Sequence, residues 1–349
     1  MADYLAFGTP GAEKPLAPLT IPRRDLGNDD VKIDIQFCGV CHSDLHFARN
    51  EWHFTVYPAV PGHEIVGRVA AVGSNVRDFK VGDLVGVGCI VDSCRECASC
   101  REGLQNYCEK GMTGTYGGTD KVTGGPTFGG YSSAIIVDRG YVLRIPAGMN
   151  LAATAPLLCA GITMYSPLRH WRAGPGMKVG IIGLGGLGHM GVKLSHAMGA
   201  TTALFTTSPS KVADGKRLGA DIVILSQSPQ DMAKHTASFD LIIDTVATDH
   251  DLGPYFELLK RDAAMVQVGA PENPLSISVF PLILRRRHFV GSAIGGIPET
   301  QEMLDFCAAN NIAADVEVIP VQYVNEAYER MLKSDVKYRF SIDMTSLGR

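Results

Sequence analysis

Residues 178–188, Lys-Val-Gly-Ile-Ile-Gly-Leu-Gly-Gly-Leu-Gly, decide the fold of this chain. The first five are mostly apolar and predict a buried parallel strand, and a helix-compatible run to Met198 follows the glycines. G-x-G-x-x-G alone is a weak signal, but between a strand and a helix it is typical of a dinucleotide-binding turn. A glycine-rich turn without a ligand is the alternative interpretation.

The glycines of this turn have separate roles in such a motif. Gly183 permits the tight turn, Gly185 lets the backbone approach a pyrophosphate, and Gly188 lets the helix lie close to the strand. The phosphate charge then meets unpaired backbone N–H groups and the positive end of the helix dipole. We therefore predict that the loop from Gly183 to Gly188, including Gly186 and Leu187, binds the cofactor.

The end of the second predicted strand, 202–206, indicates which dinucleotide binds. NAD-selective folds normally place an acidic residue there, which binds the ribose hydroxyl and repels a 2′-phosphate. This chain has Thr207, Ser208 and Lys211 instead. Because hydroxyls and a cation suit a 2′-phosphate, we predict NADP(H). A solvated helix start, capped by Ser208 and carrying an exposed lysine, is the alternative.

Apolar runs alternate with helix-compatible sequence from about residue 151 to about residue 290. After the first two strands, further strands are expected at 221–225, 239–244 and 263–269. Strands that alternate with helices form a parallel sheet covered on both faces. We therefore expect a doubly wound sheet in this part of the chain.

The part before residue 151 is rich in predicted β-structure. Residues 31–37 alternate between apolar and polar, and 65–87 is rich in β-branched residues and punctuated by glycine. Strand-like alternation resumes over 131–145, and a helical stretch at 299–310 leads back to this part. The predicted fold class is α/β, with a β-rich catalytic domain at 1–152, a doubly wound NADP-binding domain at 153–292 and a return segment at 293–349 that completes the first domain.

Residues 38–46, Cys-Gly-Val-Cys-His-Ser-Asp-Leu-His, concentrate ionisable groups after an apolar strand, as a metal or acid–base site requires. Cys41, with His63 and Cys159 from two other motifs, forms the Cys/Cys/His set of a catalytic zinc, whose fourth position stays open. A C-x-x-C redox pair and an inert, buried Cys41 are the alternatives. A redox motif should open a helix, whereas we expect this one to end a strand.

Four further cysteines have the spacing C-x2-C-x2-C-x7-C. They are Cys94, Cys97, Cys100 and Cys108. Four thiolates this close can surround one tetrahedral zinc and leave no position open, so we predict a structural zinc lobe at about 90–112. An iron–sulfur cluster is the alternative, but the spacing differs from that of the ferredoxins.

Composition excludes several classes of partner. The 349 residues are 46% hydrophobic and 19% charged, and 32 Lys and Arg nearly balance 36 Asp and Glu. No basic run or basic–aromatic interleaving indicates nucleic acid or a membrane surface. The uncharged stretch 145–168 contains three prolines, which argue against a membrane helix. With no secretory signal and nine cysteines suited to metal binding, we expect a cytoplasmic protein.

Six separated motifs together resemble the zinc-dependent medium-chain alcohol dehydrogenases, most closely the cinnamyl alcohol dehydrogenase-like branch that includes bacterial aldehyde reductases. The motifs are residues 38–46, Pro-Gly-His-Glu at 61–64, the four-cysteine lobe, Cys-Ala-Gly-Ile-Thr at 159–163, the glycine turn at 183–188 and Gly-Ser-Ala-Ile-Gly-Gly at 291–296. The resemblance covers essentially the full chain. It implies a GroES-like catalytic domain, an inserted Rossmann domain and an active site in the cleft between them.

The resemblance also assigns roles around the catalytic zinc. It implies that Cys41, His63 and Cys159 are the ligands, with Glu64 as the fourth in some states. Asp44 resembles the carboxylate that orients the imidazole of His63.

Further roles implied by the resemblance concern the proton and the cofactor. Ser43 looks like the hydroxyl that takes the alcohol proton and passes it through the cofactor ribose to His46. His42 resembles the residue that meets the pyrophosphate, and Thr163 and Ser292 match positions beside the nicotinamide.

The predicted activity is reversible reduction of aldehydes to primary alcohols with NADP(H) and two zinc ions per chain. Aromatic or medium-chain aldehydes would fit if Trp52 and Ile294 line a pocket, although Trp52 could equally be core. Reduction of another polarised double bond and a non-catalytic NADPH-binding scaffold are the alternatives. We also expect a homodimer, from the resemblance and from the apolar segment 279–283 beside a strand at 288–291.

Overall fold

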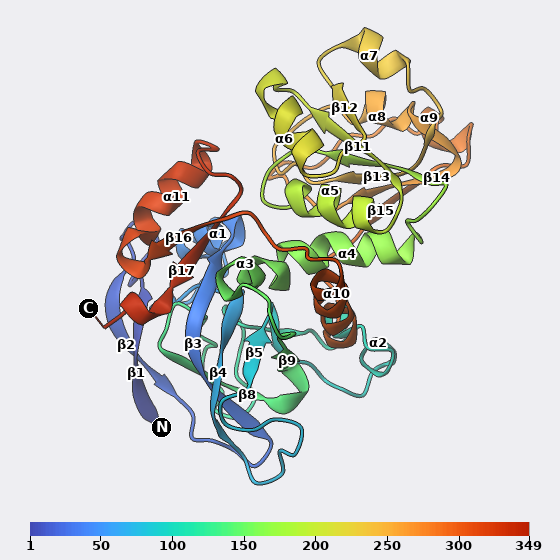
Figure 1. Cartoon of the computed structure of the whole chain (residues 1–349). Helices are drawn as coiled ribbons and strands as arrows, with labels where there is room; N and C mark the ends of the chain where they lie inside the picture. The colour runs from blue at the N-terminus through green and yellow to red at the C-terminus, as the bar shows by residue number, and fades with distance from the viewer. Residues whose placement is uncertain (349) are drawn as a thin grey trace. The chain divides into compact units, whose positions relative to one another are not determined.

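The computed structural model describes residues 1–348, which form two compact units (Figure 1). The first unit comprises residues 1–162 together with the chain from 295 onward, and the second comprises Thr163–Ile294. Residues 153–162 therefore belong to the first unit, although the sequence placed them in the second domain. The reason is packing, because Leu158 lies against Gly86 and Gly88 of the β-rich unit.

The second unit is built on a six-stranded sheet in the order β12-β11-β10-β13-β14-β15, with every neighbouring pair parallel. The strands are β10 (Lys178–Ile182), β11 (Thr201–Thr206), β12 (Ile222–Leu225), β13 (Phe239–Asp244), β14 (Leu259–Gln267) and β15 (His288–Gly291). The order reverses between β10 and β13, and ligands bind at such a reversal in doubly wound sheets. The predicted parallel sheet is confirmed.

Short helices connect these strands. They are α5 (Gly188–Ala197), α6 (Val212–Arg217), α7 (Pro229–Ala233), α8 (Gly253–Phe256) and α9 (Phe280–Ile283), with the 3-10 turn η4 at Pro209–Lys211. The core of the unit lies under them and includes Phe205, Phe239, Phe256 and Met265, all at most 1% exposed. The central strands β10, β11 and β13 are buried on both faces, which explains why their sequences are continuous apolar runs.

The first unit is organised around a seven-stranded sheet in the order β16-β17-β3-β4-β5-β9, with β8 also paired to β3. Its strands are β3 (Asp30–Val40), β4 (Ile65–Val72), β5 (Leu84–Val87), β8 (Ala134–Asp138), β9 (Leu143–Arg144), β16 (Val316–Pro320) and β17 (Arg339–Asp343). Two small sheets pair β1 (Ala2–Gly8) with β2 (Ala17–Arg23) and β6 (Ile90–Asp92) with β7 (Thr113–Gly114).

Helices of the first unit frame this sheet. They are α1 (His42–Ala48), α2 (Ala98–Arg101), α3 (Leu151–Thr154), α10 (Ile297–Ala309) and α11 (Val324–Leu332), with 3-10 turns η1 (Gln105–Tyr107), η2 (Arg139–Tyr141), η3 (Ala155–Leu158), η5 (Val321–Tyr323) and η6 (Met344–Ser346). Helix α4 (Ala160–His170) continues into the second unit. Strand β3 buries Val31, Ile33 and Ile35, as the predicted alternation requires.

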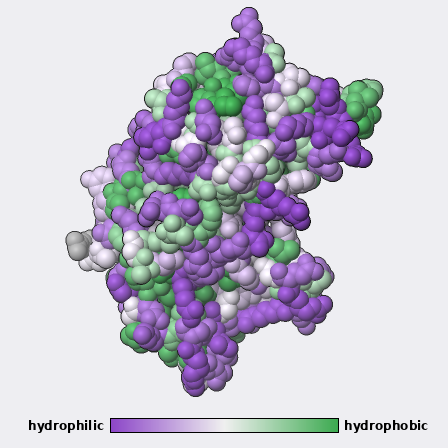
Figure 2. All heavy atoms as spheres, turned by 45° about the vertical axis from the view of Figure 1, so that its right-hand side comes forward, coloured by the Kyte–Doolittle hydropathy of each residue, from purple (hydrophilic) through white to green (hydrophobic). Residues whose placement is uncertain are grey.

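Within residues 1–348, no single helix has both the length and the apolar character to cross a membrane. Only the segments Leu151–Leu158 and Ala160–His170, bent by 55°, meet that test as a pair. Hydrophilic side chains cover most of the face shown in Figure 2, where hydrophobic atoms form separate patches.

Candidate metal and coenzyme sites

The first unit brings four predicted metal ligands together. One ligand atom from each of Cys41, His63, Glu64 and Cys159 lies within 4.8 Å of the other three. Cys41 follows β3, His63 and Glu64 immediately precede β4, and Cys159 ends the 3-10 turn η3. The pairing of Cys38 with Ile65 joins the first two segments, so the sheet itself positions the ligands.

The C-x-x-C motif ends strand β3, as expected. Cys41 is also the N-cap of α1, so the motif opens a helix as well. The redox interpretation fails for another reason, because Cys38 is fully buried and burial raises the pKa of its thiol well above the ordinary value. Cys41 also contacts Cys159 and His63, and these hydrogen bonds hold the pKa of Cys41 well below its ordinary value.

Asp44 orients His63. Its carboxylate is fully buried and accepts hydrogen bonds from His63 Nδ1 at 3.0 Å, Gly62 N at 3.0 Å and Cys41 N at 2.8 Å. Burial alone would lower the pKa of His63, but Asp44 raises it well above its ordinary value. A carboxylate that holds Nδ1 fixes the ring and leaves Nε2 as the metal-binding nitrogen.

Glu64 and Arg339 form a buried ion pair that the sequence did not predict. Arg339 lies on β17, is 5% exposed and donates from Nη2 to Oε1 of Glu64. The other carboxylate oxygen, Oε2, is buried without a hydrogen-bond partner among the described residues. Burial raises the pKa of Glu64 to about 7. A Cβ on Gly39 would lie 1.9 Å from Oε2, so glycine makes room for this carboxylate.

The donors of this cluster fit zinc. Two thiols, an imidazole and a carboxylate are the ligand types of catalytic zinc sites, and a buried carboxylate oxygen without a partner is satisfied by a cation. The one sequence signal for Arg339 is an arginine at the start of an apolar strand, which by itself does not point to a partner 275 residues away.

The predicted proton-transfer residues lie on α1. Ser43 Oγ is 3.7 Å from Cys41 Sγ, and His46 follows one turn later. His46 Nδ1 is hydrogen-bonded to the carboxylate of Glu51, which the sequence analysis missed. Because a carboxylate only accepts, Nδ1 carries a proton, and in the neutral ring Nε2 is then the acceptor.

The four-cysteine lobe also brings its ligands together. The sulfur atoms of Cys94, Cys97, Cys100 and Cys108 lie within 4.8 Å of one another. Backbone N–H groups point at them: Cys97 N lies 3.3 Å from Cys94 Sγ, and Cys94 N lies 3.4 Å from Cys108 Sγ. Such N–H···S contacts stabilise thiolates, and four thiolates fit a closed zinc site.

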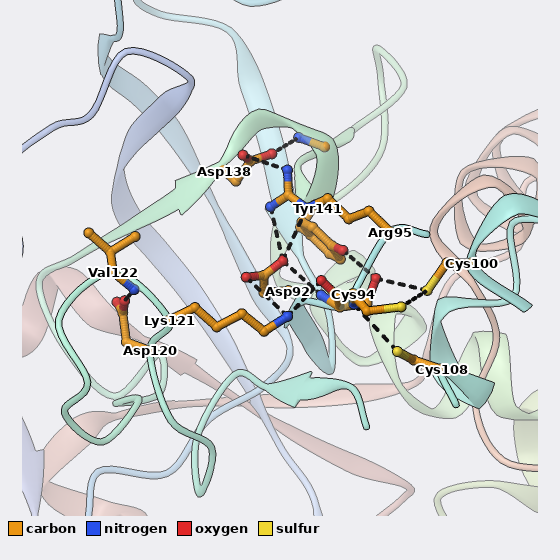
Figure 3. Close-up of polar contacts among 12 residues, drawn as sticks. Asp92, Cys94, Arg95, Cys100, Cys108, Asp120, Lys121, Val122, Asp138 and Tyr141 are labelled. Atoms are coloured by element: carbon orange, nitrogen blue, oxygen red, sulfur yellow. Dashed lines mark hydrogen bonds and ion pairs between the residues drawn. The ribbon is translucent and has the colours of Figure 1, made fainter. Parts of the chain in front are cut away.

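Polar contacts tie this lobe to the neighbouring sheet (Figure 3). Ser93 Oγ lies 3.2 Å from Cys100 Sγ and 2.7 Å from the hydroxyl of Tyr141. Arg95 bridges Asp92 and Asp138 at 2.9 Å each and lies over the Tyr141 ring. These polar contacts therefore hold the lobe against the sheet, in addition to the cysteine ligands that hold it together.

The second unit places the glycine turn between β10 and α5. Gly183 has a φ of +92°, which favours glycine, and a Cβ on Gly188 would lie 2.0 Å from Gly183 O. No atom lies within 4 Å of a Cβ built on Gly185, so the space above that backbone is open. A tight turn, a close helix and an open backbone surface fit a bound pyrophosphate.

The end of β11 lies next to this turn. Thr207 is exposed, and the ammonium of Lys211 donates to Leu184 O, within the glycine turn, at 3.0 Å. Ser208 stands at the N-cap of η4, as the alternative interpretation expects, but its Oγ pairs with Ser210 Oγ at 2.8 Å and makes no capping hydrogen bond. Lys211 is half-buried rather than fully solvated.

The remaining residues predicted to contact the cofactor or the substrate lie at separate positions in the structure. His42 is exposed at the start of α1, Thr163 is buried on α4, and Ser292 donates from its backbone N–H to Gln267 O at 3.1 Å. Trp52 is 42% exposed, which excludes a core role, and Ile294 is half-buried with a φ of +43°. Their roles toward cofactor and substrate stay predictions.

Two family models match the chain. Residues 27–147 match the alcohol dehydrogenase GroES-like domain, and residues 186–309 match the zinc-binding dehydrogenase model. The chain is 60% identical over 344 residues to aldehyde reductase YahK of Escherichia coli, covering 98% of each sequence. It is 56% identical over 348 residues to NADP-dependent alcohol dehydrogenase C 1 of Mycolicibacterium smegmatis, covering 99% of each.

Solved structures agree with these matches. The cinnamyl alcohol dehydrogenase SbCAD4 of Sorghum bicolor superposes with a TM-score of 0.95 at 43% identity, covering 99% of this chain and 98% of that one. The cinnamyl alcohol dehydrogenase of Helicobacter pylori, complexed with NADP(H), superposes with a TM-score of 0.92 at 39% identity, covering 99% of both.

Proposed function

The chain belongs to the zinc-binding alcohol dehydrogenases with a GroES-like domain, and from that premise we propose that it transfers hydride reversibly between NADP(H) and an aldehyde or primary alcohol. The observation that carries the proposal is the cluster of Cys41, His63, Glu64 and Cys159. A scaffold with two structural metals would not need a displaceable carboxylate in one of them.

Different residues of the chain bind the metal, orient its ligands and provide a displaceable ligand. When bound, zinc supplies a Lewis acid for the carbonyl oxygen and NADPH supplies the hydride. Cys41, His63 and Cys159 hold the metal in the proposed arrangement, and Asp44 fixes the His63 ring. Glu64, held by Arg339, is the displaceable carboxylate.

Proton transfer is assigned to Ser43 and His46. The Ser43 hydroxyl can both accept and donate, so it suits a relay beside Cys41. Glu51 holds Nδ1 of His46 and keeps Nε2 as the proton acceptor. Because these groups move only a proton, their loss should slow the reaction without emptying the metal site.

Aromatic and medium-chain aldehydes are the proposed substrates. Trp52 and Phe54 stack with ring centroids 5.8 Å apart and an interplanar angle of 17°, and both are about half exposed. The Trp52 ring also lies 5.3 Å from that of His46. An exposed aromatic pair next to the relay histidine suits an aromatic substrate.

We also propose a cytoplasmic location.

One experiment tests the activity and its alternatives. Zinc is counted per chain, and NADPH oxidation is followed with cinnamaldehyde and benzaldehyde. Two zinc ions and turnover of both aldehydes are expected. Two zinc ions without turnover would favour the scaffold, and turnover only of substrates with a conjugated double bond or an imine would favour the other reductase class.

Mild chelation should separate the two metals. The first cluster keeps a displaceable position and the four-cysteine cluster does not, so a chelator should remove one zinc and the activity before the fold is lost. The measurement follows zinc release, NADPH oxidation and circular dichroism together. Loss of secondary structure in step with activity would contradict the assignment.

A homodimer formed through the second unit is a further proposal. Phe280, Ile283 and Leu284 are at least 65% exposed beside β15, which ends its sheet and pairs only with β14 among the described residues. Exposed apolar groups next to an open strand edge suit a two-fold partner.

Replacing Phe280 with Asp should turn the dimer into a monomer, because a charge would be buried at the interface. Val81→Asp, at a similarly exposed apolar site of the first unit, is the matched control and should leave the mass unchanged. Sedimentation measures both. A wild-type mass of one chain at micromolar concentration would rule the dimer out.

A further inference from the structure

A buried tyrosine stands behind the carboxylate that holds His63. Tyr131 is 0% exposed, and its hydroxyl donates to Oδ2 of Asp44 at 3.3 Å. The other Asp44 oxygen, Oδ1, accepts from His63 Nδ1. One carboxylate thus links a phenol on one side to the imidazole on the other.

The backbone around Tyr131 holds the same loop that carries His63. Tyr131 N donates to Pro61 O at 3.0 Å, and Gly130 N donates to Gly62 O at 2.7 Å. Gly62 has a φ of +101°, and a Cβ there would lie 2.7 Å from Cδ1 of Tyr131. The ring therefore packs directly on the backbone that precedes His63, and neither can move without the other.

A second tyrosine reaches this network from the C-terminal part of the chain. Tyr328 lies on α11, which packs against α1, and it is 2% exposed. Its hydroxyl is buried. The phenols of Tyr131 and Tyr328 interact with each other, and burial followed by the charge of Asp44 raises the pKa of both. Both hydroxyls therefore stay protonated and able to donate.

We propose that Tyr131 and Tyr328 are positioning residues of the catalytic zinc, acting through Asp44 on the ring of His63. The inference rests on the proposed zinc-dependent function. Tyr131 holds Asp44 directly, while Tyr328 extends the network to α11. Groups that orient a metal-binding histidine from outside typically change metal affinity or activity by 10-fold to 100-fold.

The test uses the full-length protein with both metals bound. Tyr131→Phe keeps the ring and removes the hydroxyl. A chelator should therefore remove the zinc of the Cys41, His63 and Cys159 site about 10-fold faster than from wild type. The kcat should fall, while KM for NADPH stays unchanged. Tyr328→Phe should shift the same two readouts less. Tyr255→Phe is the matched control, because it removes a buried tyrosine hydroxyl from the second unit, and it should change neither.

The outcomes separate this inference from the proposed function. The inference would be overturned if a chelator removed the catalytic zinc from Tyr131→Phe at the wild-type rate. It would also be overturned if Tyr255→Phe released that zinc as fast as Tyr131→Phe does. Wild-type protein that holds no exchangeable zinc, or whose activity survives its removal, would instead overturn the proposed function. If the release rate rises in Tyr131→Phe but not in Tyr328→Phe, the role of Tyr328 is overturned and that of Tyr131 stands.

Discussion

Replacing Cys159 with Ala should abolish the oxidoreductase activity and lower the zinc content from two ions to one per chain. One thiolate fewer leaves His63, Cys41 and a carboxylate already paired with Arg339, which is a poor set for retaining zinc. Without the Lewis acid, kcat/KM should fall by at least about 10³-fold, equivalent to about 4 kcal/mol of barrier. Zinc analysis and NADPH-dependent aldehyde reduction measure the two effects.

The crossed control is Cys97→Ala. It removes a ligand of the other cluster, so it should also lose one zinc, but its main effect should be a lower Tm because the lobe depends on its metal. Cys159→Ala should keep a Tm close to wild type. Retention of two zinc ions and full activity in Cys159→Ala would show that this thiol is not a ligand.

The second large effect is expected at Thr207. The Thr207→Asp substitution places a negative charge at the end of β11, beside the site we assign to the 2′-phosphate. A like-charge contact in a partly desolvated site should cost about 2 to 4 kcal/mol, so kcat/KM for NADPH should fall by about 30-fold to 900-fold. The same carboxylate can accept hydrogen bonds from the ribose hydroxyls of NADH, so activity with NADH should hold or rise.

The measurement is the ratio of kcat/KM for NADPH to that for NADH, compared between wild type and variant. Thr201→Asp provides a matched control, because it makes the same change at the exposed opposite end of the same strand. Its ratio should match that of wild type. If wild type prefers NADH, or if Thr207→Asp leaves the ratio unchanged, then Thr207, Ser208 and Lys211 do not bind a 2′-phosphate.

The sequence alone was sufficient to predict the features that depend only on residues close to one another in the chain. Residues 178–188 predicted β10, the turn and α5, because a strand, a glycine motif and a helix follow one another without a gap. The four cysteines between 94 and 108 predicted a cluster for the same reason, since a short loop cannot keep four thiols apart. Alternation over 31–37 predicted β3, because one face of that strand is buried.

Local spacing was less reliable at element ends. The sequence analysis expected Cys41 to end a strand, but the residue also caps α1, because Asp44 three residues later accepts from the Cys41 backbone N–H. The chain likewise stays in the first unit beyond residue 152, because Leu158 packs on β5 before α4 leaves. In both places, a contact made by a residue later in the chain decided where the helix begins or where the unit ends.

What only the tertiary structure decided is the set of partners around each site. Arg339 reaches Glu64 across 275 residues, and Tyr131 reaches Asp44 across 87. Lys211 likewise meets the glycine turn at Leu184. No spacing rule connects such pairs, since sheet order and register bring them together: β17 lies beside β3, and β11 beside β10. The sequence could therefore name the ligands, while the groups that hold those ligands in place became visible only once the strands were paired.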